Sequence, residues 1–372
     1  MPELGFFRKL GVLMNARALP SRYYIDADVF TRAREAVFFS NWQYACHESQ
    51  VEAHGSYYAF SLFEQDILLV RDGEGILRGF YNVCQHRGHT LVENGEGQAK
   101  LLTCPYHKWT YELSGGLRAA PGGSKNKNFV REEICLTQVR VETFMGFVFV
   151  NLDDSSAPMD ELYPDVVNAV TKLCPDIKAQ RFAFDHHTVE ECNWLVAVAN
   201  YNECYHCKNA HQAFSKGVVD PASYDIQQFS SGRVLHHSAR AAKQGEAWYE
   251  SGAGEDEKAY GSFYLYPGFS LQIYPGGLAN TYHWRPLSVE TTRVYRSWFS
   301  LDGKVDTRLQ EVIDLDRDTT FAEDLALVKS TQRGLHSRGY RPSALMISPD
   351  GTGIDSEHSI ALLHGWVEKD LA

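Results

Sequence analysis

The sequence predicts an α+β protein in which a small antiparallel β domain precedes a larger domain of helices and antiparallel strands. Short alternating apolar runs, separated by glycine and aspartate turns, dominate residues 41–153. Helical periodicity and two strand-like runs follow in residues 154–372. Each part also carries its own group of cysteine and histidine residues. The chain has 372 residues, 44% of them hydrophobic, which is long enough for two cores.

The N-terminal segment, residues 1–40, is expected to be helical. Phe30 and Ala33 lie at helical spacing, which predicts a helix over about Ala27–Trp42 with Asp26 as its N-cap. The β domain should then occupy residues 41–153. Its clearest strands are expected near Tyr57–Leu62, Ile67–Arg71 and Phe144–Asn151. A polar stretch at residues 153–158 ends this domain.

The second domain, residues 154–372, is expected to combine helices with antiparallel strands. Helices are expected near Glu161–Cys174, Asn193–Ala210 and Thr307–Leu335, the last of them being the final helix. Strands are expected near Tyr264–Tyr274 and Thr291–Leu301. No internal repeat is present in the sequence.

The charge and hydropathy of the chain disfavour two classes of partner. A formal net charge of -11 opposes general attraction to nucleic acid. No apolar run reaches the roughly 18 residues of a membrane-spanning helix, and Met1–Pro20 is too mixed for a secretory signal. We therefore expect a cytoplasmic protein with neither nucleic acid nor membrane as a partner.

The chain has 8 cysteines, and several of them stand beside histidines, which favours metal ligation over disulfides. Four of the cysteines are nevertheless expected to be buried apolar thiols without a function. These are Cys46, Cys135, Cys174 and Cys192.

The first cysteine and histidine group lies in the β domain. Cys84 and His86 form one pair, and Cys104 and His107 form a second pair. The 17 residues 87 through 103 lie between the two pairs. Each half offers one thiolate and one imidazole, the mixture that a Rieske [2Fe-2S] cluster needs, because two thiolates hold one iron and two histidines hold the other. A structural zinc site is the alternative.

This segment resembles the Rieske domain of ring-hydroxylating and related oxygenases. The resemblance includes Arg87-Gly88, Tyr106 and Trp109 beside the four ligands. Two positions depart from the family pattern: Gln85 stands where proline is frequent, and Lys108 where glycine or alanine is common. Lys108 is either a solvated surface lysine, or a residue that tunes the reduction potential of the cluster or helps to dock an electron donor.

The second group contains His206 and His211. Two histidines and a carboxylate on one face of iron(II) leave positions open for dioxygen and substrate. On an ideal helix, residues five apart lie roughly 140° apart, so either the helix bends or ends near His211, or the metal lies to one side. Taken alone, this pair is equally compatible with zinc, because Cys207 lies beside it.

The same segment resembles the catalytic iron motif of the Rieske non-haem iron oxygenase alpha subunits, at the usual distance after the Rieske motif. The departures are Leu195, Ala199 and Gln212, where lysine, glutamate and proline are common. The resemblance implies a mononuclear Fe(II) held by His206 and His211, and a catalytic domain of the helix-grip type, with an antiparallel sheet and covering helices.

The third iron ligand should be a carboxylate far along the chain, where several compete. Asp324 shares a helical stripe with Phe321 and Val328, where a bare carboxylate is costly unless it is paired or bound to metal. The alternative is a cap or a salt bridge. The surrounding sequence Glu323-Asp324-Leu325 is similar to the tail of carnitine monooxygenase oxygenase components, which also favours Asp324.

The resemblance implies an oxygenase component that uses O2 and electrons from a separate NAD(P)H-dependent flavin and iron-sulfur reductase, since no nucleotide fingerprint is present in the chain. It also implies a homotrimer in which Glu203 carries electrons from a neighbouring subunit's cluster to the mononuclear iron. We therefore expect Glu203 and Asp324 to be catalytic. A Rieske electron carrier without catalysis and a non-catalytic metal-binding protein are the competing classes.

The substrate class rests on Glu203 and on an aromatic stretch. Glutamate at 203 is similar to the carnitine and betaine group, whereas aromatic-ring dioxygenases usually have aspartate, and aromatic rings can form a cation–π cage for a methylated ammonium. Aromatic rings at strand spacing are more often plain core. The candidate cage residues are Tyr201, Tyr264, Tyr266, Phe269, Tyr282 and Trp284. We expect monooxygenation of a quaternary ammonium compound, ending in N-demethylation or C–N cleavage; the alternative is an aromatic or other non-ammonium substrate.

Overall fold

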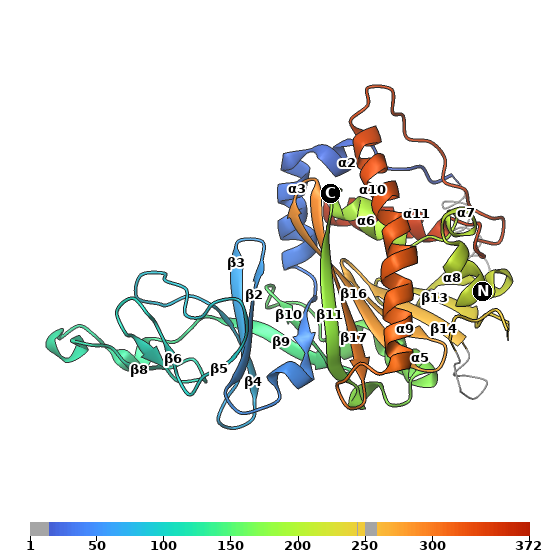
Figure 1. Cartoon of the computed structure of the whole chain (residues 1–372). Coiled ribbons are helices and arrows are strands. Elements are labelled where there is room, and N and C mark those ends of the chain that lie inside the picture. The colour runs from blue at the N-terminus through green and yellow to red at the C-terminus, as the bar shows by residue number, and fades with distance from the viewer. Residues whose placement is uncertain (1–14, 244, 250–258) are drawn as a thin grey trace, which may run out of the picture. The chain divides into compact units, whose positions relative to one another are not determined.

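The computed structural model describes residues 15–243, 245–249 and 259–372, which fall into two compact units (Figure 1). One unit is residues 39–159. The other joins the N-terminal residues up to Phe38 to residues 160–372. The N-terminal segment, expected as a part of its own, thus belongs to the same unit as the second domain.

The N-terminal helices form as expected. Asp26 caps the start of α3 (Ala27–Ala33), its carboxylate accepting hydrogen bonds from the backbone of Asp28 and Val29. A short helix α2 (Arg22–Ile25) precedes it, and a π-helical turn η1 (Arg34–Phe39) continues it.

The unit of residues 39–159 is built on antiparallel strands, as the alternating runs predict. Its larger sheet has the strand order β1-β10-β9-β4-β3-β2-β5, and a small sheet has the order β6-β7-β8. The strands of the larger sheet are β1 (Gln43–His47), β2 (Ser56–Leu62), β3 (Gln65–Arg71), β4 (Leu77–Tyr81), β5 (Gly95–Gln98), β9 (Gln138–Phe144) and β10 (Phe147–Asn151). Those of the small sheet are β6 (Leu102–Thr103), β7 (Thr110–Tyr111) and β8 (Leu117–Ala119).

The larger unit contains one antiparallel sheet with the order β11-β17-β16-β15-β14-β13-β12. Its strands are β11 (Arg181–Glu190), β12 (Asp225–Gln228), β13 (Val234–Arg240), β14 (Ala259–Leu265), β15 (Phe269–Tyr274), β16 (Leu278–Ser288) and β17 (Thr291–Ser300). The run expected as a single strand from Tyr264 to Tyr274 is therefore the hairpin β14–β15. Even-numbered residues of β14, β15 and β16 share one face of the sheet because side chains alternate along a strand.

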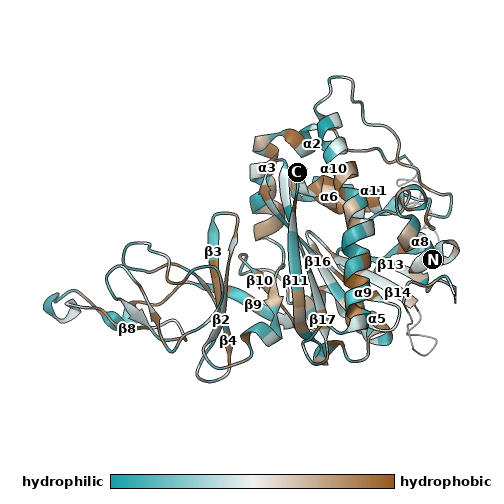
Figure 2. Ribbon diagram, viewed as in Figure 1, coloured by the Kyte–Doolittle hydropathy of each residue, from teal (hydrophilic) through white to brown (hydrophobic). Residues whose placement is uncertain are grey.

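Helices cover both faces of this sheet. The early helices are α4 (Met159–Leu162), α5 (Pro164–Leu173), α6 (Trp194–Tyr201), α7 (Cys207–Ala210) and α8 (Gln212–Gly217). The later ones are α9 (Thr307–Leu315), the π-helical turn η8 (Asp316–Thr320), α10 (Phe321–Leu335) and α11 (His358–Asp370). In Figure 2, α6 is coloured as mostly apolar, and α9 and α10 alternate between polar and apolar residues, as an amphipathic helix does. The α+β fold with an antiparallel sheet and covering helices is confirmed.

Two helical expectations need correction. The segment Asn193–Ala210 is not one helix, because α6 ends at Tyr201 and α7 begins only at Cys207. The helical run from Thr307 to Leu335 is confirmed, with a π-helical turn inside it, but it is not the last helix, since α11 follows. None of the helices in the described part of the chain is both long and apolar enough to cross a membrane.

Candidate metal centres and the adjoining cavity

Two loops of the β unit present the first group of ligands with the same backbone design. In the first loop, Cys84 N–H donates to the His89 carbonyl and Gly88 N–H donates to the Cys84 carbonyl. In the second, Cys104 and Lys108 make the equivalent pair of bonds. Gly88 and Lys108 both adopt positive φ, at 73° and 62°. Two matched turns therefore hold the two ligand pairs.

The four candidate cluster ligands are brought together in a way that suits a Rieske cluster. Cys84 and Cys104 are buried, and the rings of His86 and His107 lie 4.6 Å apart at 80° on the more exposed side. Burial raises the pKa of the Cys84 thiol, and the neighbouring Cys104 raises it further. Two such thiols ionise together only when a cation compensates them, so this donor set fits an iron–sulfur cluster.

Neighbouring side chains support these ligands. The Tyr111 hydroxyl accepts a hydrogen bond from the Gln85 backbone N–H at 3.0 Å, which leaves its proton for the Cys84 sulfur at 3.3 Å. A hydrogen bond to a ligating sulfur raises the potential of an iron–sulfur cluster. His86 stacks on Trp109, with ring centroids 4.6 Å apart, which fixes the plane of its imidazole.

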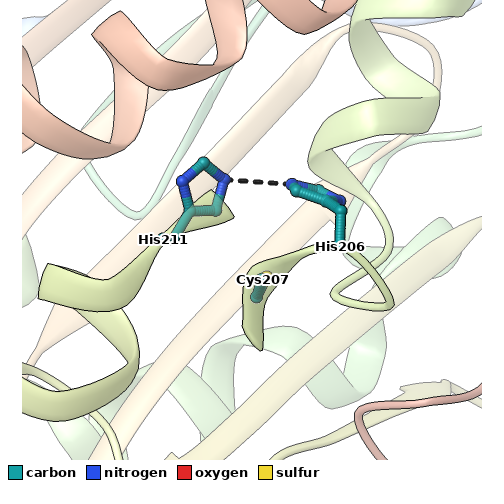
Figure 3. A group of neighbouring side chains, drawn as sticks. All are labelled: His206, Cys207 and His211. Carbon is teal, nitrogen blue, oxygen red and sulfur yellow. Dashed lines mark hydrogen bonds between the residues drawn. The ribbon is translucent and has the colours of Figure 1, made fainter. Parts of the chain in front are cut away.

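The second group lies where the helix breaks. His206 precedes α7, and His211 is the residue between α7 and α8, with φ -107° and ψ 64°. The helix therefore ends at His211, as the five-residue spacing requires, and the two rings face each other (Figure 3). Their Nε2 atoms lie 3.0 Å apart.

Asp324, the carboxylate expected from α10, completes this group. Its Oδ1 lies 3.1 Å from His211 Nε2 and 3.5 Å from His206 Nε2. Burial lowers the pKa of His206, but the hydrogen bonds and charges of Asp324 and Glu203 raise it to about 10. Burial raises the pKa of Asp324, but the two histidines lower it to about 2. Three donor atoms that converge in this way fit a divalent metal, whose charge replaces the protons between them.

Each ligand is also held from behind. The Nδ1 atom of His211 donates to Glu323 Oε2 at 2.8 Å, and Nδ1 of His206 donates to Glu203. The Asn200 amide donates to Asp324 Oδ1 at 3.0 Å. A carboxylate on Nδ1 fixes the tautomer in which Nε2 is free to bind a metal.

Cys204 and Cys207 form a disulfide in this segment, which the sequence had not indicated. Cys207 also lies close to the two histidines, in keeping with its position in Figure 3. Of the other cysteines, Cys46, Cys174 and Cys192 are buried as expected. The expectation was wrong for Cys135, which is exposed.

A cavity adjoins the three converging ligand atoms, and its walls are largely aromatic. Besides His206, His211 and Asp324, the rings that line it are Phe214, Tyr201, Tyr224, Tyr260, Tyr274 and Tyr282. Gln272, Thr320 and Asp316 add polar groups. This combination of apolar walls and a few fixed polar groups is typical of a small-molecule site.

The structure brings some, but not all, of the six candidate cage residues to this cavity. Tyr201 and Tyr282 line it, and Trp284 packs against Tyr201 from behind at 4.8 Å. Tyr264 and Tyr266 lie elsewhere in the core, where their hydroxyls donate to the Pro267 carbonyl and to Asp370. Phe269 is buried and does not line the cavity either.

Five of the lining rings were not predicted from the sequence: Phe214, Tyr224, His237, Tyr260 and Tyr274. Strand alternation is the signal that could have found two of them. Tyr260 and Tyr274 have even numbers on β14 and β15 and therefore share a sheet face with Tyr282.

Family models match both parts of the chain. The Rieske [2Fe-2S] domain matches residues 41–139, and the ring hydroxylating alpha subunit (catalytic domain) matches residues 179–372.

The relatives span nearly the whole chain. The carnitine monooxygenase oxygenase subunit of Escherichia coli (strain K12) is 35% identical over 354 residues, which cover 94% of this chain and 92% of that protein. The chloroplastic choline monooxygenase of Beta vulgaris is 28% identical over 91% of this chain and 75% of its own length. A quaternary ammonium Rieske monooxygenase solved in complex with its substrate L-carnitine has a TM-score of 0.86 at 29% identity, covering 98% of each chain.

The two domain models match in the same order as the two candidate metal centres, and a 35% identical relative covers nearly all of the chain. The chain therefore belongs to the Rieske non-haem iron oxygenase alpha subunits, which carry a [2Fe-2S] cluster and a mononuclear iron.

Proposed function

We propose that this chain is the oxygenase component of a two-component Rieske monooxygenase acting on a small quaternary ammonium compound of the carnitine or betaine type. The product would arise by N-demethylation or C–N cleavage. The observation that carries this proposal is a cavity lined by five tyrosines beside the converging atoms of His206, His211 and Asp324. The relatives named for carnitine and choline support the same substrate class.

The proposal assigns the [2Fe-2S] cluster to Cys84, His86, Cys104 and His107, and the mononuclear iron to His206, His211 and Asp324. When both are bound, they supply the reductive activation of dioxygen. The protein positions these ligands: Glu203 and Glu323 keep the Nε2 atoms of the two histidines free, and Asn200 orients the Asp324 carboxylate.

The tyrosine rings bind and orient the substrate. A methylated ammonium can lie against the rings of Tyr201 and Tyr282. The centroids of these two rings are 5.2 Å apart, and the ring planes are tilted by 37° relative to each other. The Tyr201 ring is fixed by its hydroxyl, which lies 2.7 and 2.8 Å from the Ser262 and Ser270 hydroxyls and accepts from Gln272 at 2.8 Å. Fixed rings hold one methyl group toward the metal centre and exclude water from it.

Electrons would come from a separate NAD(P)H-dependent flavin and iron-sulfur reductase, and the working assembly would be a homotrimer in the cytoplasm. A solved relative is described as showing inter-subunit electron transfer, which supports an assembly of several subunits. No nucleotide-binding fingerprint occurs in the sequence, which supports a separate reductase.

The test is product analysis. The iron-loaded oxygenase is incubated with a Rieske-oxygenase reductase, NADH and oxygen, and with carnitine, glycine betaine, choline or benzoate in turn. We expect oxygen uptake with formaldehyde or trimethylamine as product for at least one ammonium compound, and none with benzoate. Oxidation of benzoate alone, or of another compound without an ammonium group, would favour a non-ammonium oxygenase.

A further inference from the structure

One side of the cavity is formed by tyrosines whose hydroxyls meet a buried carboxylate. The Tyr282 hydroxyl donates to Asp316 Oδ1 at 2.5 Å, and the Tyr274 hydroxyl reaches the same atom at 3.5 Å. Asp316 is 2% exposed and belongs to the π-helical turn η8. Its carboxylate therefore stands behind the rings, not in solvent.

Arg296 forms an ion pair with this carboxylate from the other side. Burial raises the pKa of Asp316, and the charge of Arg296 opposes that shift. Its Nη1 donates to Asp316 Oδ2 at 3.0 Å, and it pairs with Tyr282 across β16 and β17. The guanidinium is 1% exposed and lies 3.6 Å from the centre of the Phe321 ring. Arg296 does not line the cavity, whereas Asp316 does. The ion pair thus presents its negative end toward the cavity.

Among the described residues that line the cavity, the charged groups other than histidine are all carboxylates: Glu203, Asp316 and Asp324. His237 also lines it, and burial lowers the pKa of that imidazole to about 3, so the ring is neutral. The formal charge of a bound iron(II) is opposed by Asp324 and by the carboxylates on the two imidazoles. The carboxylates around the cavity therefore favour a positively charged ligand.

Tyr201 provides a natural comparison within the same cavity. Its ring also lines the cavity, but its hydrogen-bond partners among the described residues are neutral: the Ser262 and Ser270 hydroxyls and the Gln272 amide. The Tyr201 and Tyr282 rings lie 5.2 Å apart. The two tyrosines therefore differ mainly in whether a carboxylate accepts the phenol proton.

We propose that Asp316 is a positioning residue that makes the cavity selective for a cation, acting through the Tyr282 hydroxyl. A phenol that donates to a carboxylate gains electron density on its ring, and the attraction of a ring face for a cation grows with that density. Burial keeps solvent from screening the carboxylate. This inference rests on the proposed ammonium chemistry and names the group that supplies its selectivity.

The experiment compares a cation with its uncharged isostere. Choline and 3,3-dimethylbutan-1-ol have the same shape, with carbon replacing nitrogen, and their affinities for the metal-loaded protein are measured by titration calorimetry. In Tyr282→Phe, we expect the preference for choline to fall by about 3-fold to 10-fold, with the affinity for the neutral alcohol nearly unchanged. In the matched variant Tyr201→Phe, we expect the preference to remain.

A second variant addresses the carboxylate itself. Asp316→Asn alone would leave Arg296 as an unpaired buried charge and endanger folding, so Asp316→Asn is combined with Arg296→Gln. The fold is checked by the content of mononuclear iron, whose candidate ligands belong to the same unit as Asp316 and Arg296. The double variant should show the same loss of preference as Tyr282→Phe. An unchanged preference in Tyr282→Phe, or an equal loss in Tyr201→Phe, would overturn the role of Asp316. A wild-type protein that does not prefer choline would instead overturn the ammonium chemistry itself.

Discussion

Asp324 illustrates how a single residue becomes a site. It lies on the same stripe of α10 as the buried Phe321 and Val328, where an isolated carboxylate would be costly. The cost is offset because the carboxylate meets His206, His211 and the Asn200 amide. The stripe and the two histidines were predicted from the sequence, but the Asn200 hydrogen bond, from a residue more than a hundred positions away, was not.

Replacing Asp324 with alanine should remove the mononuclear iron and the activity, because only two histidines would remain to bind it. The cluster spectrum should persist, since the cluster's candidate ligands lie in the other unit. Iron content and visible absorbance measure the two centres separately. The neighbouring variant Glu323→Gln is the control, with weaker iron binding by about 10-fold to 100-fold but not its loss. Full iron content in Asp324→Ala would move the third ligand elsewhere.

Because of Glu190, at the end of β11, we expect the free energy of unfolding to depend on pH. Burial, with the charge of Asp324, raises its pKa from 4.5 to about 8. Between these values the folded state keeps a proton that the unfolded state has lost, so stability falls as pH rises from about 4.5 to about 8 and then levels off. At pH 7 the loss is at most about 3 kcal/mol.

Thermal unfolding of Glu190→Gln between pH 5 and pH 8 tests this, because the variant should lose most of that slope. Glu191→Gln is the matched control, since Glu191 is exposed and pairs with Lys329 at the surface. Parallel slopes for the wild type and Glu190→Gln would show that Glu190 does not titrate in this range.

At the scale of elements, the two cluster loops share one backbone design but place different residues at the position with positive φ. Gly88 and Lys108 make the same hydrogen bond at positive φ, where only glycine escapes a penalty of about 1–2 kcal/mol. Gly88→Ala should therefore destabilise the β unit by about 1 kcal/mol, and a Cβ at Gly88 meets no other atom within 4 Å, so strain alone is tested.

Lys108→Gly should stabilise the β unit by about 0.5–1 kcal/mol. The gain is small because the relief of backbone strain is partly offset by the greater freedom of glycine in the unfolded chain. Thermal loss of the cluster absorbance reports both variants. A lower melting temperature for Lys108→Gly would mean that the lysine side chain contributes more to this loop than its backbone costs.

The elements also show where the sequence was informative. The Cys and His spacings, the Asp26 cap and the break at His211 all follow from local rules that act over a few residues. The cavity does not. Alternation places Tyr260, Tyr264 and Tyr274 on one sheet face, but only the strand register decides which rung lies beside the metal ligands. Tyr264, predicted from the sequence, lies four residues beyond the lining residue Tyr260 on β14, and therefore away from the cavity.

At the scale of the whole molecule, the sequence indicated two metal-binding parts but not which segments build the larger one. The N-terminal helices belong to it because Tyr24 meets His364 and its carbonyl accepts from Gln332. Contacts between residues more than three hundred positions apart leave no periodic trace in a single sequence, which is why residues 1–40 were expected to form a segment of their own.

Glu203 connects one chain to the working assembly. Both of its carboxylate oxygens face His206, one bonded to the ring Nδ1 and the other to the backbone N–H at 3.3 Å. The carboxylate keeps further lone pairs, and its side chain remains 15% exposed. In the proposed trimer, a histidine of the neighbouring subunit's cluster, His107, would donate to it, giving electrons a hydrogen-bonded path to the mononuclear iron.

Glu203→Gln separates this path from the support of His206. The glutamine oxygen can still accept from His206 Nδ1, so iron content and substrate affinity should stay close to those of the wild type, while the lost charge weakens the bond from the neighbour. We expect reoxidation of the pre-reduced cluster, followed by rapid-mixing absorbance with substrate and oxygen present, to slow by about 10-fold or more. Glu323→Gln, which alters the support of His211 instead, should slow reoxidation only in proportion to its iron loss. Wild-type reoxidation in Glu203→Gln, or a fully active monomer, would exclude the inter-subunit route through this residue.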